Sequence, residues 1–272
     1  MEFKNKVAVI TGGASGIGRS TALAMAKLGA DIVVSDRDTK NLDSVCREIN
    51  QLGRKSLGIE CDVSSNTDVE SLASKTISVL GKADILVTCA GMSVYGIFEK
   101  MDMKDYELLF NINFLGTIRC VQAFSKHMIN RGSGYIVITS SRAGLVPMVE
   151  PYPLSKYATT GFAEGLYCYL RPKGIMVSTL CPAMVNTNLR FNSLFRGNEQ
   201  EIKKTKEWAE QAFTDENALS PDQVADILIQ GMKDQKFLIL THSIEQTIKD
   251  TTARGRDIIK LEKYLQDTYK GS

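Results

Sequence analysis

The stretch VAVITGGASGIG, Val7 to Gly18, passes from an apolar run through a glycine-rich turn, and RSTALAMAKLG continues it with helical spacing. A buried strand that leads through such a turn into a helix is typical of the first unit of a parallel α/β domain. Gly12, Gly16 and Gly18 allow a tight turn, a close approach of backbone to a pyrophosphate, and close packing of helix on strand. The helix start also offers free N–H groups and a positive dipole end to phosphate. Together with Ser15 and Ile17, the turn predicts a dinucleotide site; a merely flexible glycine turn is the alternative.

Apolar, β-rich runs recur along the chain, and amphipathic helical patterns lie between them. The apolar runs are 7–11, 31–36, 55–62, 84–91, 134–141, 175–182 and 236–242. The helical patterns are 16–29, 40–52, 66–80, 103–131, 152–171 and 221–234. Strands that alternate with helices indicate right-handed crossovers and a parallel sheet covered on both faces. We therefore predict one α/β domain over 1–272, a Rossmann-like, doubly wound, seven-stranded parallel sheet in three α/β/α layers with strand order 3-2-1-4-5-6-7.

The composition narrows the class of protein. A net charge of +2, from 33 basic and 31 acidic residues, is too balanced for a nucleic-acid-binding surface. Neither of the two histidines lies near paired cysteines, so we expect no metal site. The six cysteines form no Cys-x-x-Cys pair and are typical of reduced core residues. With no signal peptide and no apolar run long enough to span a membrane, we expect a soluble, cytoplasmic protein.

Acidic residues follow the second and third predicted strands, where a bound adenosine would lie. Asp36 ends the second strand, and a carboxylate there can accept hydrogen bonds from both ribose hydroxyls while repelling a 2′-phosphate. Ser15 is not the basic residue that would help an NADP enzyme. Arg37, in contrast, could accommodate a 2′-phosphate. On the strength of Asp36 and Ser15 we favour NAD(H) over NADP(H), without excluding NADP(H). Asp62 and Val63 follow the third strand and would border the adenine.

Six motifs occur in the order and spacing of one enzyme family. They are TGGASGIG (11–18), CAG (89–91), NFLG (113–116), SSRAG (140–144), YPLSK (152–156) and CPAMVNT (181–187). Over about residues 5–190 the chain therefore resembles the short-chain dehydrogenases/reductases. The resemblance implies reversible hydride transfer between a nicotinamide cofactor and an alcohol or carbonyl. The catalytic residues that it implies are Asn113, Ser141, Tyr152 and Lys156.

Tyr152 and Lys156 are one helical turn apart, and so are Tyr169 and Lys173. A phenol can protonate a developing alkoxide, and a nearby ammonium favours the phenolate, as does a helix N-terminus. Pro153 suits the first helical position, which would bring Tyr152 to the start of a helix and onto one face with Lys156. Pro172 lies between the second pair and predicts a helix end there, so those side chains need not share a face. The first pair is therefore the candidate catalytic couple.

The resemblance also assigns further residues and shows departures. Ser141, the second serine of its motif, would bind the substrate oxygen, with Ser140 as the competing choice. Asn113 would hold a water that links Lys156 to solvent, with Asn111 as the competing choice. Cys89 stands where the family usually has asparagine, so a side-chain hydrogen bond is lost or remade. The remaining residues that the resemblance brings to the cofactor are Ala90, Gly91, Pro182, Val185 and Thr187.

The substrate side is less specific. The segments 91–98, 142–151 and the one after Thr187 are mostly apolar, which favours a small hydrophobic alcohol or ketone. The charged segment 188–218 is either a substrate lid or a surface helix, and 243–268 reads as a C-terminal amphipathic helix that packs on the body, on a second subunit, or peripherally on a membrane. The family commonly forms homodimers or homotetramers through the helices predicted at 103–131 and 152–171. Alternative functions are a catalytically silent NAD(P)-binding scaffold or sensor and a ketosphinganine-like lipid ketone reductase that uses NADPH.

Overall fold

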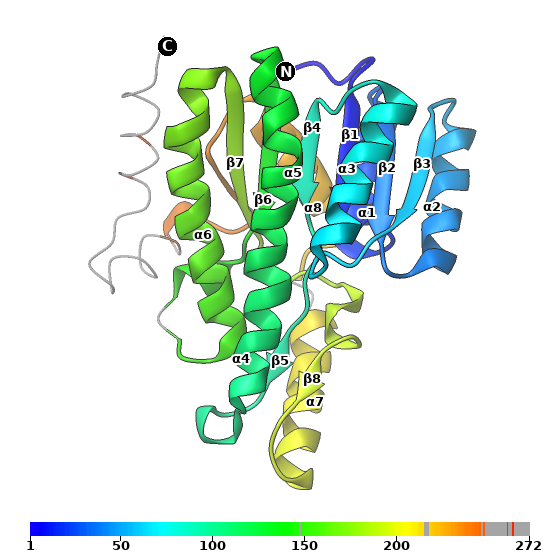
Figure 1. Ribbon diagram of the computed structural model, residues 1–272. Coiled ribbons are helices and arrows are strands. Elements are labelled where there is room, and N and C mark those ends of the chain that lie inside the picture. Colours follow the sequence, from blue (N-terminus) through cyan, green and yellow to red (C-terminus); the bar gives the residue numbers. More distant parts are fainter. Residues whose placement is uncertain (147, 215–217, 246, 248–259, 261–262, 264–272) are drawn as a thin grey trace.

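A seven-stranded parallel sheet forms the centre of the computed structural model (Figure 1). The structure describes residues 1–272 apart from 147, 215–217, 246, 248–259, 261–262 and 264–272. The strands follow the order β3-β2-β1-β4-β6-β7-β9, which is the predicted order of the seven sheet strands, and every ladder is parallel. Their bounds are β1 Val7–Thr11, β2 Asp31–Asp36, β3 Ser56–Glu60, β4 Ile85–Thr88, β6 Gly134–Thr139, β7 Ile175–Cys181 and β9 Leu238–Leu240. The fold class predicted from the sequence is confirmed.

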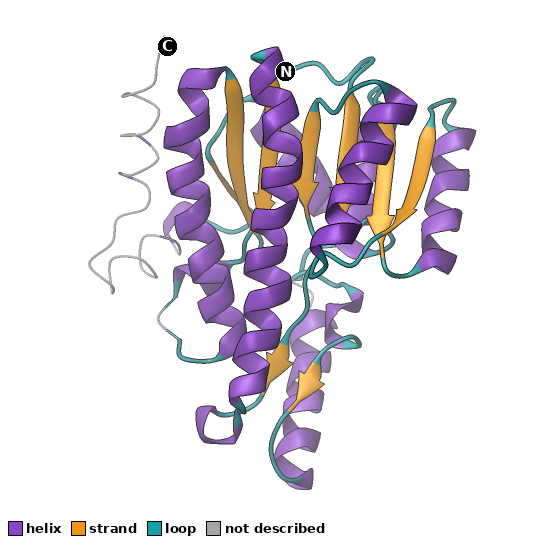
Figure 2. Cartoon of the chain, in the orientation of Figure 1, coloured by secondary structure: helices purple, strands orange, loops and turns teal. Residues whose placement is uncertain are grey.

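Helices cover both faces of the sheet and make the three layers seen in Figure 2. One face packs against α3 (Asn66–Leu80), α5 (Gly116–Arg131) and α6 (Pro151–Leu170), and the other against α1 (Gly16–Lys27), α2 (Thr39–Gln51) and α8 (Pro221–Lys233). In β1, Val7 and Val9 belong to the first core while Ala8 and Ile10 belong to the second. Successive strand side chains point to opposite faces, so an unbroken apolar run can fill two cores at once.

The helix predicted over 103–131 is three elements in the structure. These are α4 (Met103–Leu109), a π-helix η2 (Phe110–Leu115) and α5. In the π turn the carbonyl of Asn113 accepts a hydrogen bond from Thr117 Oγ1 at 2.9 Å. The periodicity of apolar residues continues through the segment, which is why the pattern alone indicated one helix.

The helix that carries the tyrosine–lysine pair begins earlier than predicted. Glu150 is its N-cap and Pro151, rather than Pro153, takes the first position. It ends at Leu170, as Pro172 predicted, and continues as a 3₁₀ turn, η4 (Arg171–Lys173). Even so, Lys173 Nζ lies 3.7 Å from the centroid of the Tyr169 ring. The two pairs therefore both make contact, and contact does not distinguish them.

Beyond the carboxyl ends of the sheet strands lies a small second sheet, visible at the bottom of Figure 1. Strand β5 (Val94–Tyr95) pairs in parallel with β8 (Leu194–Phe195). The segment after Thr187 forms η5 (Asn188–Arg190), β8 and α7 (Glu199–Thr214). The prediction of a helical segment is right for α7, but the strand pairing was not predicted because its two partners lie far apart in the sequence.

The described chain also contains two further short 3₁₀ helices, η1 (Phe98–Lys100) and η3 (Arg142–Leu145). Most of the helix predicted at 243–268 falls outside the described residues. Over the described part, the model contains no helix with the length and apolar character that crossing a bilayer requires.

Candidate active site

A cavity of about 1320 Å³ opens at the carboxyl edge of the sheet. Carboxyl ends of parallel strands meet at one edge, and the motif residues follow β1, β2, β3, β4, β6 and β7. The cavity brings together the residues predicted to bind cofactor: Gly12, Ser15, Gly16, Ile17, Gly18, Asp36, Arg37, Asp62, Val63, Cys89, Ala90, Gly91, Tyr152, Lys156, Pro182, Val185 and Thr187. Ser141 lines it as well.

The glycine turn has room for backbone only. Gly12 and Gly16 have φ angles of +64° and +51°. A Cβ on Gly12 would lie 2.6 Å from the amide nitrogen of Ala90, and one on Gly18 would lie 2.1 Å from the carbonyl oxygen of Gly12. Any side chain here would push β1, α1 and the turn after β4 apart. The turn thus presents bare backbone and the start of α1 to the cavity, which fits the pyrophosphate of a dinucleotide.

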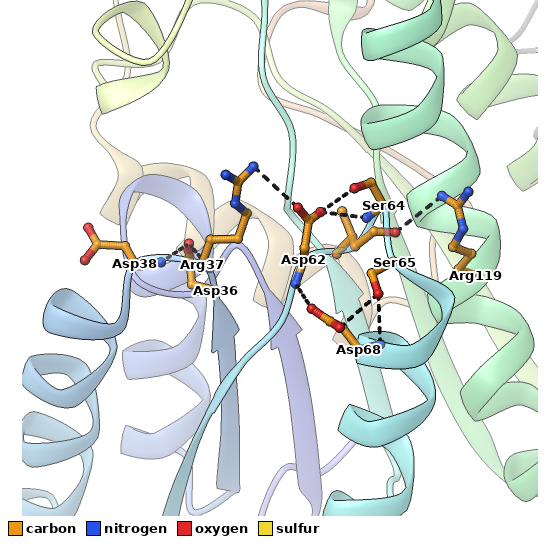
Figure 3. A network of polar contacts seen from close by, with 9 residues as sticks. Asp36, Arg37, Asp38, Asp62, Ser64, Ser65, Asp68 and Arg119 are labelled. Atoms are coloured by element: carbon orange, nitrogen blue, oxygen red, sulfur yellow. Dashed lines mark hydrogen bonds and ion pairs between the residues drawn. The ribbon is translucent and has the colours of Figure 1, made fainter.

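The residues at the ends of β2 and β3 form a polar network, shown in Figure 3. Asp36 accepts hydrogen bonds from the backbone N–H of Ala14 at 3.1 Å and of Arg37 at 2.7 Å. The Asp36 carboxylate therefore orders its own turn and the glycine turn while facing the cavity. The Arg37 guanidinium lies 3.5 Å from the carboxylate of Asp62. The pKa of Asp62 is lowered: burial raises it, but bonds from Ser64 and the charges of Arg37 and Arg119 outweigh that effect.

Lys156 is buried and Tyr152 is half-buried at the other end of the cavity. Burial raises the pKa of Tyr152 to about 12, a hydrogen bond from Ser141 opposing it. Burial lowers the pKa of Lys156 to about 8. The expectation that the lysine and the helix start lower the pKa of the tyrosine is therefore wrong for this structure, because desolvation of the phenol dominates. The Lys156 ammonium donates to the carbonyl oxygen of Thr139 at 2.9 Å and lies 5.9 Å from the centroid of the Tyr152 ring.

The structure separates the two candidate serines and the two candidate asparagines. Ser140 is buried and its hydroxyl donates to the carbonyl of Lys156 at 2.9 Å, so it holds α6 against β6. Ser141 lines the cavity, its hydroxyl acts to lower the pKa of Tyr152, and it accepts a bond from the N–H of Ala143 at 3.1 Å. Asn111 bonds Arg119 through its side chain, at 2.8 Å.

Asn113 is fully buried in the π-helix, behind the cavity wall. Its side-chain amide exchanges two 3.0 Å hydrogen bonds with the backbone of Met92 and donates to Ser155 Oγ at 3.0 Å. A Cβ on Gly91 would meet Asn113 Oδ1 at 3.1 Å and Lys156 Nζ at 3.7 Å. The lack of a side chain at Gly91 therefore lets the backbone after β4 lie close to both the asparagine and the lysine.

Cys89, which stands where the family usually has asparagine, makes a side-chain contact with the neighbouring strand. Its sulfur lies 3.3 Å from Thr139 Oγ1, at the end of the neighbouring strand β6. Burial raises the pKa of the Cys89 thiol to about 11. The thiol is therefore protonated at neutral pH, as expected of a structural cysteine. Among the described residues, no group of three or more His, Cys, Asp or Glu side chains is placed to hold a metal ion.

The sequence reasoning missed residues that reach the cavity from the small second sheet and from α7. Tyr95 and Trp208 line the cavity from β5 and α7. Their rings lie 6.0 Å apart between centroids. Tyr95 lies within the predicted apolar segment 91–98, and Trp208, the single tryptophan of the chain, lies within the charged segment 188–218. No local pattern indicates that the two side chains meet.

Comparison with known proteins agrees with this geometry. The short chain dehydrogenase family model matches residues 6–194. The chain is 35% identical over 188 residues, covering 69% of this chain and 76% of the relative, to the (2S)-[(R)-hydroxy(phenyl)methyl]succinyl-CoA dehydrogenase subunit BbsD of Thauera aromatica.

Solved structures extend the likeness beyond the matched segment. A short chain dehydrogenase/reductase from Burkholderia phymatum in complex with NAD superposes with a TM-score of 0.85 at 29% identity, covering 94% of this chain and 97% of that one. An alcohol dehydrogenase from Thermococcus sibiricus complexed with 5-hydroxy-NADP shares the fold, with a TM-score of 0.75 at 23% identity over 89% of this chain and 97% of that one.

Proposed function

Because the chain belongs to the short-chain dehydrogenase/reductase family, and so is an NAD(P)-dependent oxidoreductase acting on CH–OH or C=O groups, we propose that it interconverts a hydrophobic alcohol and its ketone with Tyr152 as general acid/base. The observation that supports this proposal is the meeting of Ser141, Tyr152 and Lys156 in one cavity with the glycine turn. When bound, the nicotinamide supplies or accepts the hydride. The other steps fall to side chains of this protein.

The tyrosine and serine hydroxyls serve the substrate oxygen. In the reducing direction Tyr152 gives its proton to that oxygen, and its raised pKa keeps the phenol protonated at neutral pH. Ser141 donates a hydrogen bond to the same oxygen and stabilises the charge that develops there. Both hydroxyls line the same cavity, so one substrate oxygen can accept hydrogen bonds from both.

Lys156 and Asn113 serve the return of the proton. With a pKa of about 8, the Lys156 amine can lose and regain a proton close to neutral pH. Lys156 would therefore resupply Tyr152 with a proton. Asn113 Oδ1 and Lys156 Nζ both lie close to Gly91, and a water held beside them would pass that proton on.

Replacing Tyr152 by phenylalanine tests the proposal because it removes one hydroxyl and keeps the ring. We expect kcat to fall about 1000-fold on a panel of aliphatic, cyclic, aromatic and long-chain ketones and alcohols, with NADH affinity unchanged. Tyr169→Phe, which alters the exposed tyrosine of the second pair, should leave kcat unchanged. Full turnover by Tyr152→Phe would refute the tyrosine mechanism. A wild-type protein that binds NADH and turns over nothing in the panel would instead be the silent scaffold.

Two finer properties belong to the proposal. We infer a hydrophobic substrate because Val94, Ile97, Val146, Met148 and Leu189 line the substrate end of the cavity. We also infer that NAD(H) is preferred over NADP(H), because Asp36 lines the cavity where its carboxylate would meet a ribose, and the Arg37 guanidinium pairs with Asp62. That preference also disfavours the NADPH-dependent ketosphinganine-like reading.

We propose that β8 and α7 act as a substrate lid and that the protein is a cytoplasmic homodimer or homotetramer. Leu115, which ends η2 directly before α5, and Tyr157 of α6 are exposed apolar side chains, at 41% and 43%, which supports association through these helices. Light scattering after size exclusion tests the oligomer, and a monomer at micromolar concentration would contradict it.

A further inference from the structure

We propose that Tyr95 and Trp208 form an aryl subsite, and that the substrate of the proposed reaction carries an aromatic ring on or next to its reacting carbon. The inference rests on the proposed function for the reaction itself. It adds the chemical class of the group beside the reacting carbon, which the apolar lining of the cavity alone does not specify.

Three aromatic rings meet where the small second sheet and α7 come together. The ring of Tyr95 stacks on Phe195 of β8, with centroids 5.5 Å apart and planes inclined by 29°. The indole of Trp208 meets Tyr95 edge-on, with centroids 6.0 Å apart and planes inclined by 68°. Stacking on Phe195 fixes the orientation of Tyr95, and the inclined planes of Tyr95 and Trp208 form a corner. Such a corner can hold an aromatic ring of the substrate, because aromatic pairs favour offset and edge-on arrangements.

The corner faces the cavity. On α7, Lys204, Thr205 and Trp208 all line the cavity, and residues spaced by three and four share one helix face. The indole is 54% exposed although it lies on this inner face. A large apolar side chain left uncovered inside a cavity gains contact area when a ligand packs on it.

The subsite lies beside the reacting groups. Tyr95, Ser141 and Tyr152 all line the same cavity, and the phenol of Tyr95 adds to the effect of burial that raises the pKa of Tyr152. The aryl subsite and the reacting hydroxyls therefore share one cavity. A ring on the reacting carbon or on its neighbour would reach the corner, whereas a distant ring would not.

The experiment compares 1-phenylethanol with 1-cyclohexylethanol, which differ in the aromaticity of one ring. Each good ring–ring contact favours the aryl compound by about twofold to tenfold, so the wild-type protein should prefer 1-phenylethanol by about tenfold in kcat/KM. Trp208→Leu should reduce that preference about fivefold, and Trp208→Phe should restore most of it. Tyr169→Leu, which alters an exposed ring at the far end of α6, is the matched control and should change nothing.

A second measurement is independent of turnover. Trp208 is the only tryptophan of the chain, so its fluorescence reports on this corner alone. Adding 1-phenylethanol to the Tyr152→Phe protein with NAD⁺, in which no NADH accumulates, should shift the emission, and adding 1-cyclohexylethanol should shift it far less. Turnover without aryl preference and without a selective fluorescence shift would overturn the subsite while leaving the proposed function intact. A selective shift with no turnover of either alcohol or its ketone would support the subsite and overturn the proposed function.

Discussion

At the residue scale, Lys156 and Lys173 have the same spacing from a tyrosine but opposite surroundings. Lys156 is 6% exposed, and burial lowers the pKa of its ammonium to about 8. Lys173 lies over the ring of Tyr169, which is 61% exposed. Local spacing brings both lysines to their tyrosines, but only burial gives an amine that can change charge near neutral pH.

Replacing Lys156 by methionine should stabilise the fold while abolishing activity. A pKa lowered from 10.5 to about 8 means that the buried ammonium destabilises the native state by about 3 kcal/mol below pH 8. The variant also loses the hydrogen bond to Thr139, which costs it about 1 kcal/mol. Its free energy of unfolding should therefore rise by about 2 kcal/mol at pH 7.

Urea unfolding at two pH values checks this prediction and its sign. As pH rises from 8 to 10.5 the unfolded lysine loses its proton too, so the wild type regains stability and the gap should nearly close by about pH 10. Lys173→Met, on the surface, should change the free energy of unfolding by less than about 0.5 kcal/mol. A Lys156→Met protein that is less stable than the wild type at pH 7 would contradict the argument.

Asp36 should decide cofactor preference. A carboxylate about 5 Å from a 2′-phosphate repels it by roughly 3 kcal/mol at an effective dielectric of about 20, which corresponds to about 100-fold in affinity. We expect NADH to bind about 100-fold more tightly than NADPH, and Asp36→Asn to reduce that ratio to about tenfold. Fluorescence titration of each nucleotide measures the ratio. Asp38→Asn, one residue beyond Arg37, is the control and should change the ratio of NADH to NADPH affinity less. Equal affinities of the wild-type protein for the two nucleotides would contradict the role of Asp36.

At the element scale, two short elements that no pattern predicted shape the site. The π-helix η2 holds Asn113 against Met92 and Ser155, and the pairing of β5 with β8 brings Tyr95 and α7 over the cavity. An ion pair fastens the second arrangement. Arg196, which follows β8, donates from Nε to both carboxylate oxygens of Asp105, at 3.1 and 2.9 Å, and from Nη2 at 2.6 Å. Asp105 is 1% exposed and belongs to the capping box of α4.

Arg196→Met should loosen β8 and α7 while the main sheet stays intact. The substitution leaves the buried Asp105 carboxylate without its cation. Because the side chain of Arg196 is 34% exposed, we expect the local stability of this segment to fall by about 2 kcal/mol, which is below the range for fully buried pairs. Backbone amides of 194–214 should then exchange about 30-fold faster with solvent deuterium.

The same measurement contains its own comparison. Arg196→Lys keeps the charge but not the two-pronged geometry, so its exchange should be intermediate. Amides of β1 and β4 should be unaffected in both variants. Unchanged exchange in 194–214 would show that the ion pair does not hold this segment.

At the scale of the whole molecule, Asp84 joins three elements at the edge of the sheet opposite the cavity. Its carboxylate accepts from the N–H of Val7 at 2.9 Å and pairs with Lys82 at 2.9 Å and Arg131 at 2.8 Å. These contacts tie the start of β1 and the start of β4 to the end of α5. Burial raises the pKa of Asp84, but the bonds from Val7, Arg131 and Lys82 outweigh it and hold the pKa below 3.8.

Asp84→Asn should destabilise the protein by about 3 kcal/mol at pH 7, because it removes the charge that satisfies two cations and a buried N–H. A depressed carboxyl pKa contributes stability above its unfolded value, and that stability is lost as pH falls below about 4. The difference between variant and wild type should therefore shrink in acid, as denaturant unfolding at pH 7 and about pH 3.5 would show. Asp234→Asn, in an exposed pair 3.9 Å from Lys236, should cost less than about 0.5 kcal/mol. A pH-independent difference would mean that the charge of Asp84 is not the cause.

The amino-acid sequence by itself determined the sheet, its strand order and the set of motif residues around the cavity. Apolar runs such as 7–11 and the turn at Gly12 act locally, and parallel strands bring every motif at a strand end to one edge. Only the tertiary structure decided the π turn at Asn113, the meeting of Tyr95 with Trp208, and the opposite pKa shifts of Tyr152 and Lys156. These depend on contacts between segments that lie well apart in the sequence and on how far each group is removed from water, and no local pattern records either quantity.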